Sequence, residues 1–408
     1  MTDDQTVDSL PFMPYTQALL GGEGATFTNY HAVQPLCCPS RASFLTGQYP
    51  HNHGVLNNLP PFGYDRMNFR RTIYTALDKA GYRTGWIGKV LNDPESHGTR
   101  PEPGFDEWLV PLGLSEVNMT EYSVSDNGTP RTFSGIFQND FYASRARSFL
   151  TAANDAPFML TLALSSPHWS RCSDDSGRCP PAPATPDLGT FEGQPFPLAS
   201  DPSLDTADRA TADEWWAREL ESVQSVDRIV FGIVDLLRRT GDLANTYIVL
   251  QSDNGMLHGE HDVFDKNVPW DRSVRVPLII RGPGFDPGTV RSDLTANVDV
   301  PATILEAAGV EPPRPLDGYS LLGGHRRGAL LLERLNGSSG ASADQPWRQI
   351  KTERGWTYWR EQFSGRRYLF DLDDDPGQLE NLIEEEPKVA AKLNRRLNRM
   401  KSCANPCP

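Results

Sequence analysis

The sequence predicts an α/β protein with a large, mainly parallel central sheet flanked by helices, followed by a small C-terminal α+β subdomain with an antiparallel sheet. Three observations predict this class. Apolar residues run almost without interruption through 158–164 and 247–250, as in strands buried on both faces of a sheet. A long helical pattern separates these runs. After about residue 315 the chain changes to short segments with polar turns.

The first part of the chain alternates between helical and extended patterns. Residues 72–80 carry apolar side chains at helical spacing and stop at Gly81, and 83–87 follow as a short strand. The run at 158–164 predicts the next strand. Residues 213–239 form a long amphipathic pattern that ends before Gly241, which predicts a helix.

The pattern continues beyond that helix with a strand at 247–250 and another at 276–280. A helix is expected at 301–308, because Pro301 stands at its start and Gly309 just past its end. We place the large domain at 1–325.

The C-terminal region, 326–408, is predicted to be the small subdomain. Prolines at 312, 313 and 315 precede it, and GSSGAS at 337–342 predicts a flexible loop. The expected antiparallel strands and the charged helix that follows them are 348–353, 356–361, 367–371 and 387–400.

Composition argues for a water-soluble chain with no general attraction to nucleic acid or anionic lipid. Of its 408 residues, 39 are Lys or Arg and 53 are Asp or Glu, a net charge of -14. Attraction to nucleic acid or anionic lipid is therefore not expected, and local cations must meet an anionic substrate. No apolar run is long enough to span a membrane, and no signal sequence opens the chain.

The six cysteines form three close pairs. Cys172 with Cys179, and Cys403 with Cys407, bracket short polar loops. Local disulfides in an exported protein and free thiols are both compatible with that spacing. Cys37 and Cys38 are adjacent and lack a Cys-x-x-Cys arrangement, which argues against a thiol redox protein.

Polar side chains follow the predicted strands where each strand ends. Lys89 follows 83–87, His168 follows 158–164, and Asp253 with Asn254 follows 247–250. Ligands of open α/β sheets bind beyond the carboxyl ends of the strands. These residues are therefore candidates for the chemistry, although a lone Lys is generally solvated and a lone His is more often structural.

The stretch from Cys37 to Gly47, CCPSRASFLTG, is the most informative of the chain. Pro39 and Ser40 favour a helix start, which would place the cysteines just before a short helix whose amide dipoles attract an anion. Arg41 could hydrogen-bond the nucleophile or that anion. By itself a cysteine here could equally be a buried residue at a strand-to-helix turn.

Two short acidic clusters predict a divalent cation. Asp3 and Asp4 open the chain, and Asp253 with Asn254 follows a strand. Carboxylate and amide oxygens are hard ligands suited to Ca²⁺ or Mg²⁺. Either cluster alone is common in solvated turns.

Cys37-x-Pro39-Ser40-Arg41 followed by Leu-Thr-Gly resembles the signature of the type I sulfatases. The resemblance implies an alkaline-phosphatase-like sandwich and a maturation enzyme that converts Cys37 to formylglycine. The hydrated aldehyde would then be the nucleophile. The stretch 48–55, QYPHNHGV, resembles the branch that contains the N-acetylglucosamine-6-sulfatases.

The same resemblance assigns roles to the other candidates. It implies a Ca²⁺ or Mg²⁺ site made by Asp3, Asp4, Cys37, Asp253 and Asn254. Catalytic roles would fall to Arg41, Lys89, His168 and Lys266, and substrate contacts to His53, Asn92 and His258.

The sequence departs from the family pattern at two places. The histidine of the usual Gly-Lys-x-His is Leu91 here, as in the glucosamine-6-sulfatase-like branch, which leaves His168, or less favourably His53, to accept the diol proton. An apolar strand normally precedes Thr-Asp-Asp-Gln, whereas this chain starts at Met1. We expect its absence to leave a gap in the sheet and to let Asp3 and Asp4 fray.

The resemblance implies an extracellular or periplasmic sulfatase that acts on a sulfated carbohydrate or aryl sulfate, with 6-O-sulfated N-acetylglucosamine of glycosaminoglycans as one candidate. A phosphonate or phosphodiester hydrolase of the same superfamily is the alternative enzyme. A catalytically impaired protein that binds sulfated glycans is the alternative from another class.

Overall fold

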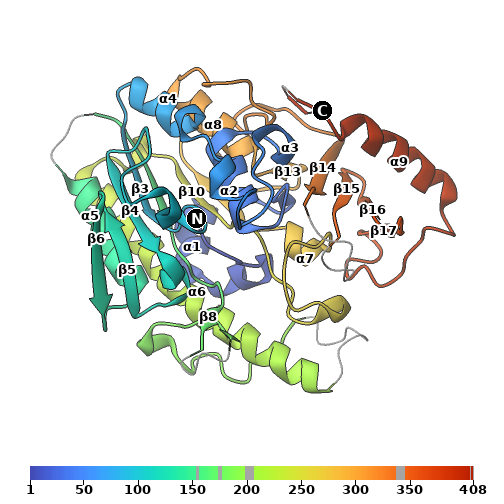
Figure 1. Cartoon of the computed structure of the whole chain (residues 1–408), viewed down its shortest axis with the longest axis horizontal. Helices are drawn as coiled ribbons and strands as arrows, with labels where there is room; N and C mark the ends of the chain where they lie inside the picture. Colours follow the sequence, from blue (N-terminus) through green and yellow to red (C-terminus); the bar gives the residue numbers. More distant parts are fainter. Residues whose placement is uncertain (153–155, 173–176, 198–205, 337–344, 405, 408) are drawn as a thin grey trace.

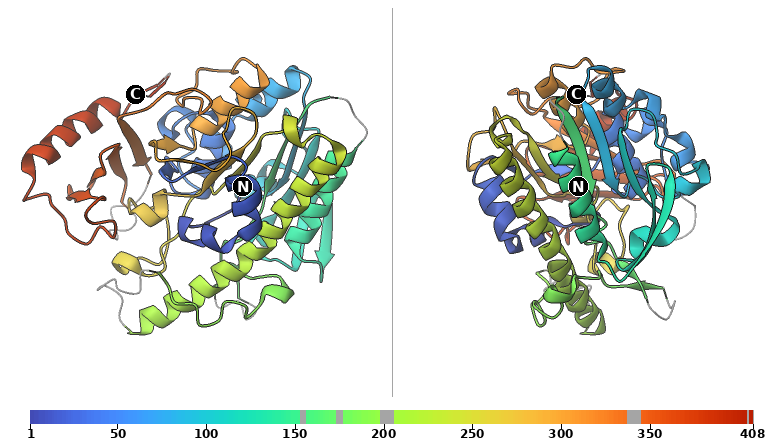
Figure 2. Two further views of the ribbon diagram at one scale, coloured as in Figure 1. Left: turned by 180° about the vertical axis from the view of Figure 1, so that it is seen from behind. Right: turned by 90° about the vertical axis from the view of Figure 1, so that its left-hand side faces the viewer.

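The computed structural model describes residues 1–152, 156–172, 177–197, 206–336, 345–404 and 406–407. Helices pack on both faces of a layer of strands, and a separate small sheet with one helix lies at the other end of the molecule (Figures 1 and 2). The predicted loop at 337–342 lies outside the described residues.

The first sheet has the strand order β6-β5-β4-β3-β7. β3 is parallel to both β4 and β7, whereas β4, β5 and β6 form an antiparallel meander. Asn127 and Gly128, both with positive φ, make the tight turn between β5 and β6. The bounds are β3 Arg83–Gly88, β4 Glu107–Leu112, β5 Glu121–Asp126, β6 Thr129–Ser134 and β7 Phe158–Ala163.

The second sheet has the order β10-β11-β1-β12 and is also mixed in direction. β11 runs antiparallel to β10 and β1, because the long loop after β10 brings the chain back in the opposite direction. The two sheets are thus less parallel than predicted. The bounds are β1 Ala25–Phe27, β10 Ile248–Gln251, β11 Leu278–Arg281 and β12 Thr289–Arg291; the two-stranded pairs are β2 Tyr30–His31 with β13 Thr295–Ala296, and β8 Ser170–Arg171 with β9 Arg178–Cys179.

The start of the chain joins the two sheets. The Met1 amino group donates to the Leu162 carbonyl of β7 at 2.9 Å, and Thr2 N–H donates to the Gln251 carbonyl of β10 at 2.9 Å. Asp3 and Asp4 are 0% and 3% exposed. The expectation that these acids fray is therefore wrong, because two residues of extended backbone between β7 and β10 suffice to hold them.

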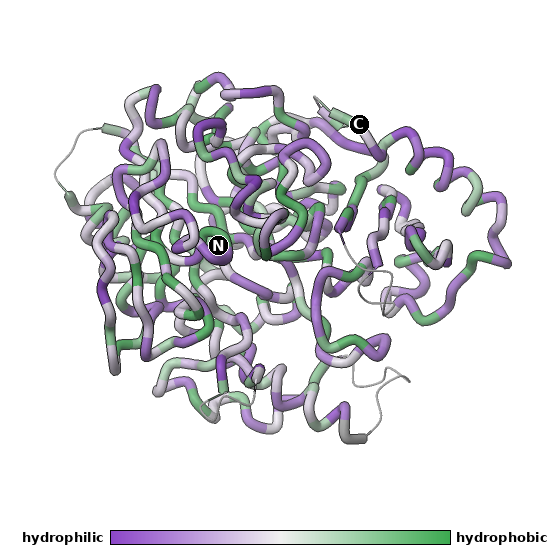
Figure 3. Tube along the Cα trace, in the orientation of Figure 1, coloured by the Kyte–Doolittle hydropathy of each residue, from purple (hydrophilic) through white to green (hydrophobic). Residues whose placement is uncertain are grey.

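Two groups of helices cover the sheets. α5 and α6 pack together on one face, and α2, α4 and α8 pack together on the other. Hydrophobic residues concentrate in the strands between these helices (Figure 3). The helix bounds are α1 Pro14–Thr16, α2 Cys37–Thr46, α3 Pro50–His53, α4 Ile73–Lys79, α5 Gln138–Thr151, α6 Thr206–Thr240, α7 Asp271–Val274 and α8 Asp299–Ala308.

The C-terminal sheet is antiparallel, in the order β14-β15-β16-β17, and α9 packs on it. Three of its strands and its helix match the prediction to within a residue, whereas the buried strand β14 was not predicted. The bounds are β14 Ala329–Arg334, β15 Trp347–Thr352, β16 Trp356–Glu361, β17 Arg367–Asp371 and α9 Pro387–Met400.

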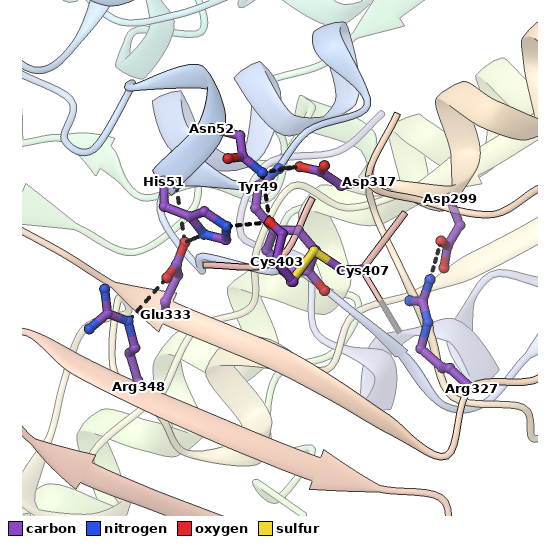
Figure 4. Close-up of a disulfide and its surroundings, with 10 residues drawn as sticks. All are labelled: Tyr49, His51, Asn52, Asp299, Asp317, Arg327, Glu333, Arg348, Cys403 and Cys407. Carbon is purple, nitrogen blue, oxygen red and sulfur yellow. Dashed lines mark hydrogen bonds and ion pairs between the residues drawn. A yellow bond between two sulfur atoms is a disulfide. The ribbon is translucent and has the colours of Figure 1, made fainter. Parts of the chain in front are cut away.

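Both candidate cysteine pairs outside the Cys37 motif form disulfides, Cys172–Cys179 and Cys403–Cys407. The second lies against the large domain, where the Cys403 carbonyl accepts hydrogen bonds from His51 and Asn52 (Figure 4). These hydrogen bonds therefore attach the segment closed by this disulfide to α3.

Candidate active site

Helix α2 brings the motif cysteine into the centre of the molecule. Leu36 is the extended N-cap residue, and every residue from Cys37 to Thr46 is buried. The cysteines were predicted to lie just before this helix. They lie in its first turn instead, because the backbone is already helical at Cys37.

The Cys37 thiol lies between two buried lysines. Its Sγ is 3.1 Å from Lys266 Nζ and 3.4 Å from Lys89 Nζ. Burial, with Asp3 nearby, raises the pKa of the thiol to about 11. An unmodified cysteine here is therefore a weak nucleophile near neutral pH, although the position is rich in cations.

Four potential metal ligands meet beside this thiol. One ligand atom from each of Asp3, Asp4, Cys37 and His168 lies within 4.8 Å of the others. Asn254 Nδ2 donates to Asp4 Oδ1 at 2.5 Å, which adds the second acidic cluster.

Two oxygens in this cluster fit a cation. Asp4 Oδ2 and Asn254 Oδ1 are buried and have no hydrogen-bond partner among the described residues. Leaving buried acceptors unpaired costs roughly 1–3 kcal/mol each, and a hard cation would satisfy both. The residues present therefore fit a Ca²⁺ or Mg²⁺ ion.

Arg41 holds the two acidic clusters together. Its Nε lies 2.7 Å from Asp253 Oδ2, and its Nη2 lies 3.2 Å from Asp3 Oδ2. It also donates to the Lys89 carbonyl. Burial alone would lower the pKa of Arg41, but Asp253 and Asp3 hold it above its ordinary value, so the guanidinium stays charged.

The lysines stay charged for the same reason. Burial alone would lower the pKa of both side chains, but Asp3 beside Lys89 and Asp4 beside Lys266 hold the two pKa values above the ordinary value. The buried acidic side chains of the site equal the basic ones in number, so a bound divalent cation would leave an excess of positive charge that attracts an anion. The acidic side chains are Asp3, Asp4 and Asp253, and the basic ones are Arg41, Lys89 and Lys266.

His168 offers a ring nitrogen on the same side. Its Nδ1 lies 2.9 Å from the Trp169 carbonyl, which can only accept, so Nδ1 carries the proton and the neutral ring presents Nε2 as an acceptor. Nε2 lies 3.6 Å from Asp4 Oδ2. Burial lowers the pKa of His168 to about 4, so the ring is neutral near pH 7.

Two of the predicted substrate residues have local partners. His53 Nε2 lies 3.0 Å from Ser43 Oγ, and its Nδ1 accepts from Val55 N–H at 3.0 Å, so both ring nitrogens are engaged. Asn92 donates through Nδ2 to Glu116 at 2.9 Å, and its backbone N–H lies 3.1 Å from Cys38 Sγ.

The third predicted substrate residue, His258, borders a small pocket that Asp4 also lines. Its Nε2 lies 3.6 Å from Glu219 Oε2.

Sequence reasoning missed several residues around the site. Ser40 donates to the Asp253 carbonyl and accepts from Asn297 at 2.9 Å, which links the helix start to the metal loop. Ser40 could have been found, because it belongs to the motif. Asn297 and the pocket residue Glu219 carry no local signal, since only folding brings them here.

A nucleophile buried at the start of a helix, with carboxylates and cationic side chains around it, can attack an anionic ester. The cationic side chains then neutralise the charge of that ester. The family model "Sulfatase" matches residues 4–310. The chain belongs to the sulfatase family, as the sequence predicted.

Two curated relatives are similar over most of this chain. The extracellular sulfatase SULF-1 homolog of Drosophila melanogaster is 33% identical over 79% of this chain, which spans only 30% of that protein's length. The N-acetylglucosamine-6-sulfatase of Homo sapiens is 29% identical over 100% of this chain and 84% of its own length.

A solved structure shares the fold. A protein in complex with its substrate D-glucosamine-2-N,6-O-disulfate superposes with a TM-score of 0.83 at 23% identity, covering 98% of this chain and 96% of its own. The predicted fold class is thereby confirmed. Among the described residues, none of the helices has the length and apolar character needed to cross a membrane.

Proposed function

We propose that this chain is a sulfatase that hydrolyses sulfate monoesters of a carbohydrate, with residue 37 as its nucleophile. The observation that carries the proposal is the convergence of the Lys89 and Lys266 ammonium groups on Cys37 Sγ, beside the Asp3 and Asp4 carboxylates. Two charged donors at the nucleophile suit a tetrahedral oxyanion bound at that point.

Cys37 is proposed to be converted to formylglycine by a maturation enzyme. A formylglycine supplies a hydrated aldehyde, whose oxygen attacks sulfur and whose second hydroxyl later permits release of sulfate. The position of the Cys37-x-Pro39-Ser40-Arg41 motif at the buried start of α2 supports this assignment.

A divalent cation, Ca²⁺ or Mg²⁺, is proposed to be held by Asp3, Asp4, Asp253, Asn254 and residue 37. The unpaired oxygens of Asp4 and Asn254 support this ligand set. The cation would supply charge neutralisation at the sulfate oxygens.

The remaining residues bind sulfate and handle protons. Lys89 and Lys266 hold the sulfate oxygens, while Arg41 orients Asp3 and Asp253. His168 presents its neutral Nε2 beside Asp4, where it can accept a proton and return it to the leaving alcohol.

The proposed substrate is a sulfated carbohydrate, with 6-O-sulfated N-acetylglucosamine as the first candidate, and the proposed location is extracellular or periplasmic. The similarity to the human N-acetylglucosamine-6-sulfatase supports the sugar, and the similarity to the Drosophila extracellular sulfatase supports the location. The two disulfides also suit an oxidising compartment.

The test combines mass spectrometry of the peptide containing Cys37 with turnover of 4-nitrophenyl sulfate and of a 4-nitrophenyl phosphonate monoester. We expect formylglycine at position 37, from a host that has the maturation enzyme, and preference for the sulfate. Preference for the phosphonate would support the alternative hydrolase. Unmodified thiol together with glycan binding and no turnover would support the impaired glycan binder.

A further inference from the structure

A cavity of about 420 Å³ lies at the C-terminal sheet, between its strands and helix α9. Its volume falls within the roughly 300–1,000 Å³ of pockets that hold small ligands. Among the described residues that line it, none belongs to the candidate active site. We call it the arginine cavity, because its wall includes Arg348, Arg360 and Arg367, together with Tyr358, Glu361 and Asn394.

The three arginines form a row across one face of the sheet. Arg348 of β15 is the register partner of Arg360 of β16, which in turn is the register partner of Arg367 of β17. Directly paired residues of neighbouring strands point to the same face, where like charges destabilise the sheet. Positive charge is thus concentrated at one place on a chain whose net charge is -14.

An acid neutralises this row only at its first strand. Arg348 Nε lies 3.4 Å from Glu333 Oε2 of β14 (Figure 4). Arg360 donates to the neutral side chain of Asn398 at 3.3 Å. Within the part of the chain that the structure describes, neither Arg360 nor Arg367 forms an ion pair. Two guanidinium groups are therefore left for an anion from outside the protein.

The acid of the cavity wall, Glu361, does not oppose that anion. It follows Arg360 in β16, and successive side chains of a strand point to opposite faces, so its carboxylate points away from the arginine row. On that other side it accepts from the Ser364 hydroxyl, and its Oε1 lies 3.5 Å from the Tyr368 hydroxyl.

Tyr358 adds a buried donor that the protein does not use. It is 1% exposed, and its hydroxyl has no hydrogen-bond partner among the described residues. Burial raises the pKa of Tyr358, whereas Arg367 and Arg360 nearby lower it. The pKa stays above its ordinary value, so the hydroxyl carries its proton near pH 7. An unpaired buried hydroxyl is costly unless a ligand satisfies it.

Asn394 of α9 adds an acceptor to the same wall. Its Oδ1 is buried and likewise has no hydrogen-bond partner within the described ranges. The arginine cavity thus offers charged donors, a hydroxyl donor and an amide acceptor. A ligand that uses all of them carries both an anionic group and a hydroxyl group.

We propose that the arginine cavity binds an anionic sugar unit of the glycan chain, separate from the unit whose ester is hydrolysed. Arg360, Arg367 and the Tyr358 hydroxyl donate to its sulfate or carboxylate group, and a sugar hydroxyl donates to Asn394 Oδ1. A free anion would leave Asn394 unpaired, and a neutral sugar would leave the arginines without a counter-charge. This inference rests on the proposed sulfatase function and adds that the substrate is a chain with more than one anionic group.

The first test measures the Kd of a heparin hexasaccharide by isothermal titration calorimetry. Cys37→Ala in every sample prevents turnover. Adding Arg367→Gln is expected to raise Kd about tenfold, because one charge-assisted hydrogen bond is lost. Arg354→Gln is the matched control, since Arg354 is exposed in the turn after β15 and lies outside the cavity. Equal Kd values for the two variants would overturn the proposal.

Tyr358→Phe separates binding from a structural role. The substitution removes only a hydroxyl that has no partner in the protein, so Tm should equal or exceed that of the wild type. Kd for the hexasaccharide should rise about tenfold, because the buried donor to the anion is lost. A lower Tm with an unchanged Kd would show that the hydroxyl supports the fold and would contradict its assignment to the ligand.

Two other ligands test which anion the cavity accepts. Inorganic sulfate is expected to bind at least about tenfold more weakly than the hexasaccharide, because it offers no hydroxyl to Asn394. Single-stranded oligothymidylate of equal charge should also bind more weakly and should not respond to Tyr358→Phe. A Kd for either ligand equal to that of the hexasaccharide would overturn the assignment to a glycan.

Turnover of 4-nitrophenyl sulfate separates this inference from the proposed function, because that ester has no second anionic group. With Cys37 intact, Arg367→Gln should leave its kcat/KM unchanged. If the wild type hydrolyses no sulfate ester but the Kd values follow the expected pattern, only the sulfatase function fails. An active enzyme whose Kd for the hexasaccharide does not respond to Arg367→Gln would contradict the cavity assignment alone.

Discussion

At the scale of single residues, Asp4 connects the proposed metal site with the small pocket that His258 borders. One of its carboxylate oxygens accepts from Asn254 and pairs with Lys266, and the other is buried without a hydrogen-bond partner among the described residues. The side chain also borders the pocket that holds His258. A cation bound here would therefore stabilise the fold as well as the substrate.

We predict that Ca²⁺ stabilises the metal-depleted protein through Asp4. At a concentration 100-fold above Kd, a ligand that binds only the folded state adds about 2.7 kcal/mol to the free energy of unfolding. Differential scanning fluorimetry after chelation should show a rise in Tm on adding Ca²⁺ for the wild type and a much smaller rise for Asp4→Asn. Asp374→Asn, at an exposed turn, should behave like the wild type. A full Ca²⁺ response in Asp4→Asn would contradict the ligand assignment.

Residue types and motif spacing were enough to select the members of the cluster. Cys37, Arg41, the acids at 3–4 and the Asp-Asn pair at 253–254 lie in short recognisable stretches, and the structure brings them together. Glu219 and Trp215, which line the small pocket beside Asp4, could not be selected in this way, because an acid and an aromatic residue on a long amphipathic helix look like ordinary surface and core positions.

At the scale of elements, the backbone conformation of Gly88, the last residue of β3, determines where Lys89 lies. Gly88 has a φ of 102°, and a Cβ built on it would lie 1.9 Å from the Ala163 carbonyl oxygen of β7. Gly81, two residues past the end of helix α4, has a similar φ of 88° but open space around its Cβ position. The two glycines therefore differ in their neighbours and not in their backbone conformation.

We predict that Gly88→Ala is more destabilising than Gly81→Ala by about 2 kcal/mol or more. Both changes strain the backbone, but only the first forces β3 and β7 apart. Urea unfolding measures the difference, and kcat/KM should fall in Gly88→Ala alone because Lys89 moves. Equal free energies of unfolding in the two variants would contradict the prediction, because they would show that β7 can move away from the new Cβ without a loss of stability.

The prediction of an element was accurate where the sequence carries both a start signal and a stop signal for it. α4 has Thr72 as its N-cap, with a hydrogen bond from Thr75 N–H, and Gly81 beyond its end. β14 was not predicted because Ala329–Arg334 is a short, largely apolar run, and no turn residues beside it distinguish a strand from a helix. Its pairing with β15 is a tertiary contact that the local sequence does not indicate.

At the scale of the whole molecule, His51 joins the large domain to the C-terminal region. Its Nδ1 lies 2.5 Å from Glu333 Oε1 of β14, and its Nε2 lies 2.9 Å from the Cys403 carbonyl (Figure 4). A protonated ring donates to both oxygens at once. Burial alone would lower the pKa of His51, but Glu333 raises it above its ordinary value.

We predict that this contact weakens as the pH rises. Because the folded pKa is raised, the stabilisation is complete below the unfolded value of about 6.5 and is lost as the pH rises through the folded pKa. The Tm difference between the wild type and His51→Gln, measured from pH 6 to pH 9, should shrink with increasing pH. A difference that stays constant over this range would show that the charge on His51 does not contribute.

By itself, the sequence determined the family, the alternation of strands and helices, and most residues of the candidate site, because those properties depend on motifs and on local apolar periodicity. Only the tertiary structure decided three other properties. These are the mixed direction of the sheets, the burial of Asp3 and Asp4 between β7 and β10, and the pocket that brings Glu219 to Asp4. Each depends on contacts between segments far apart in the chain, which no local pattern encodes.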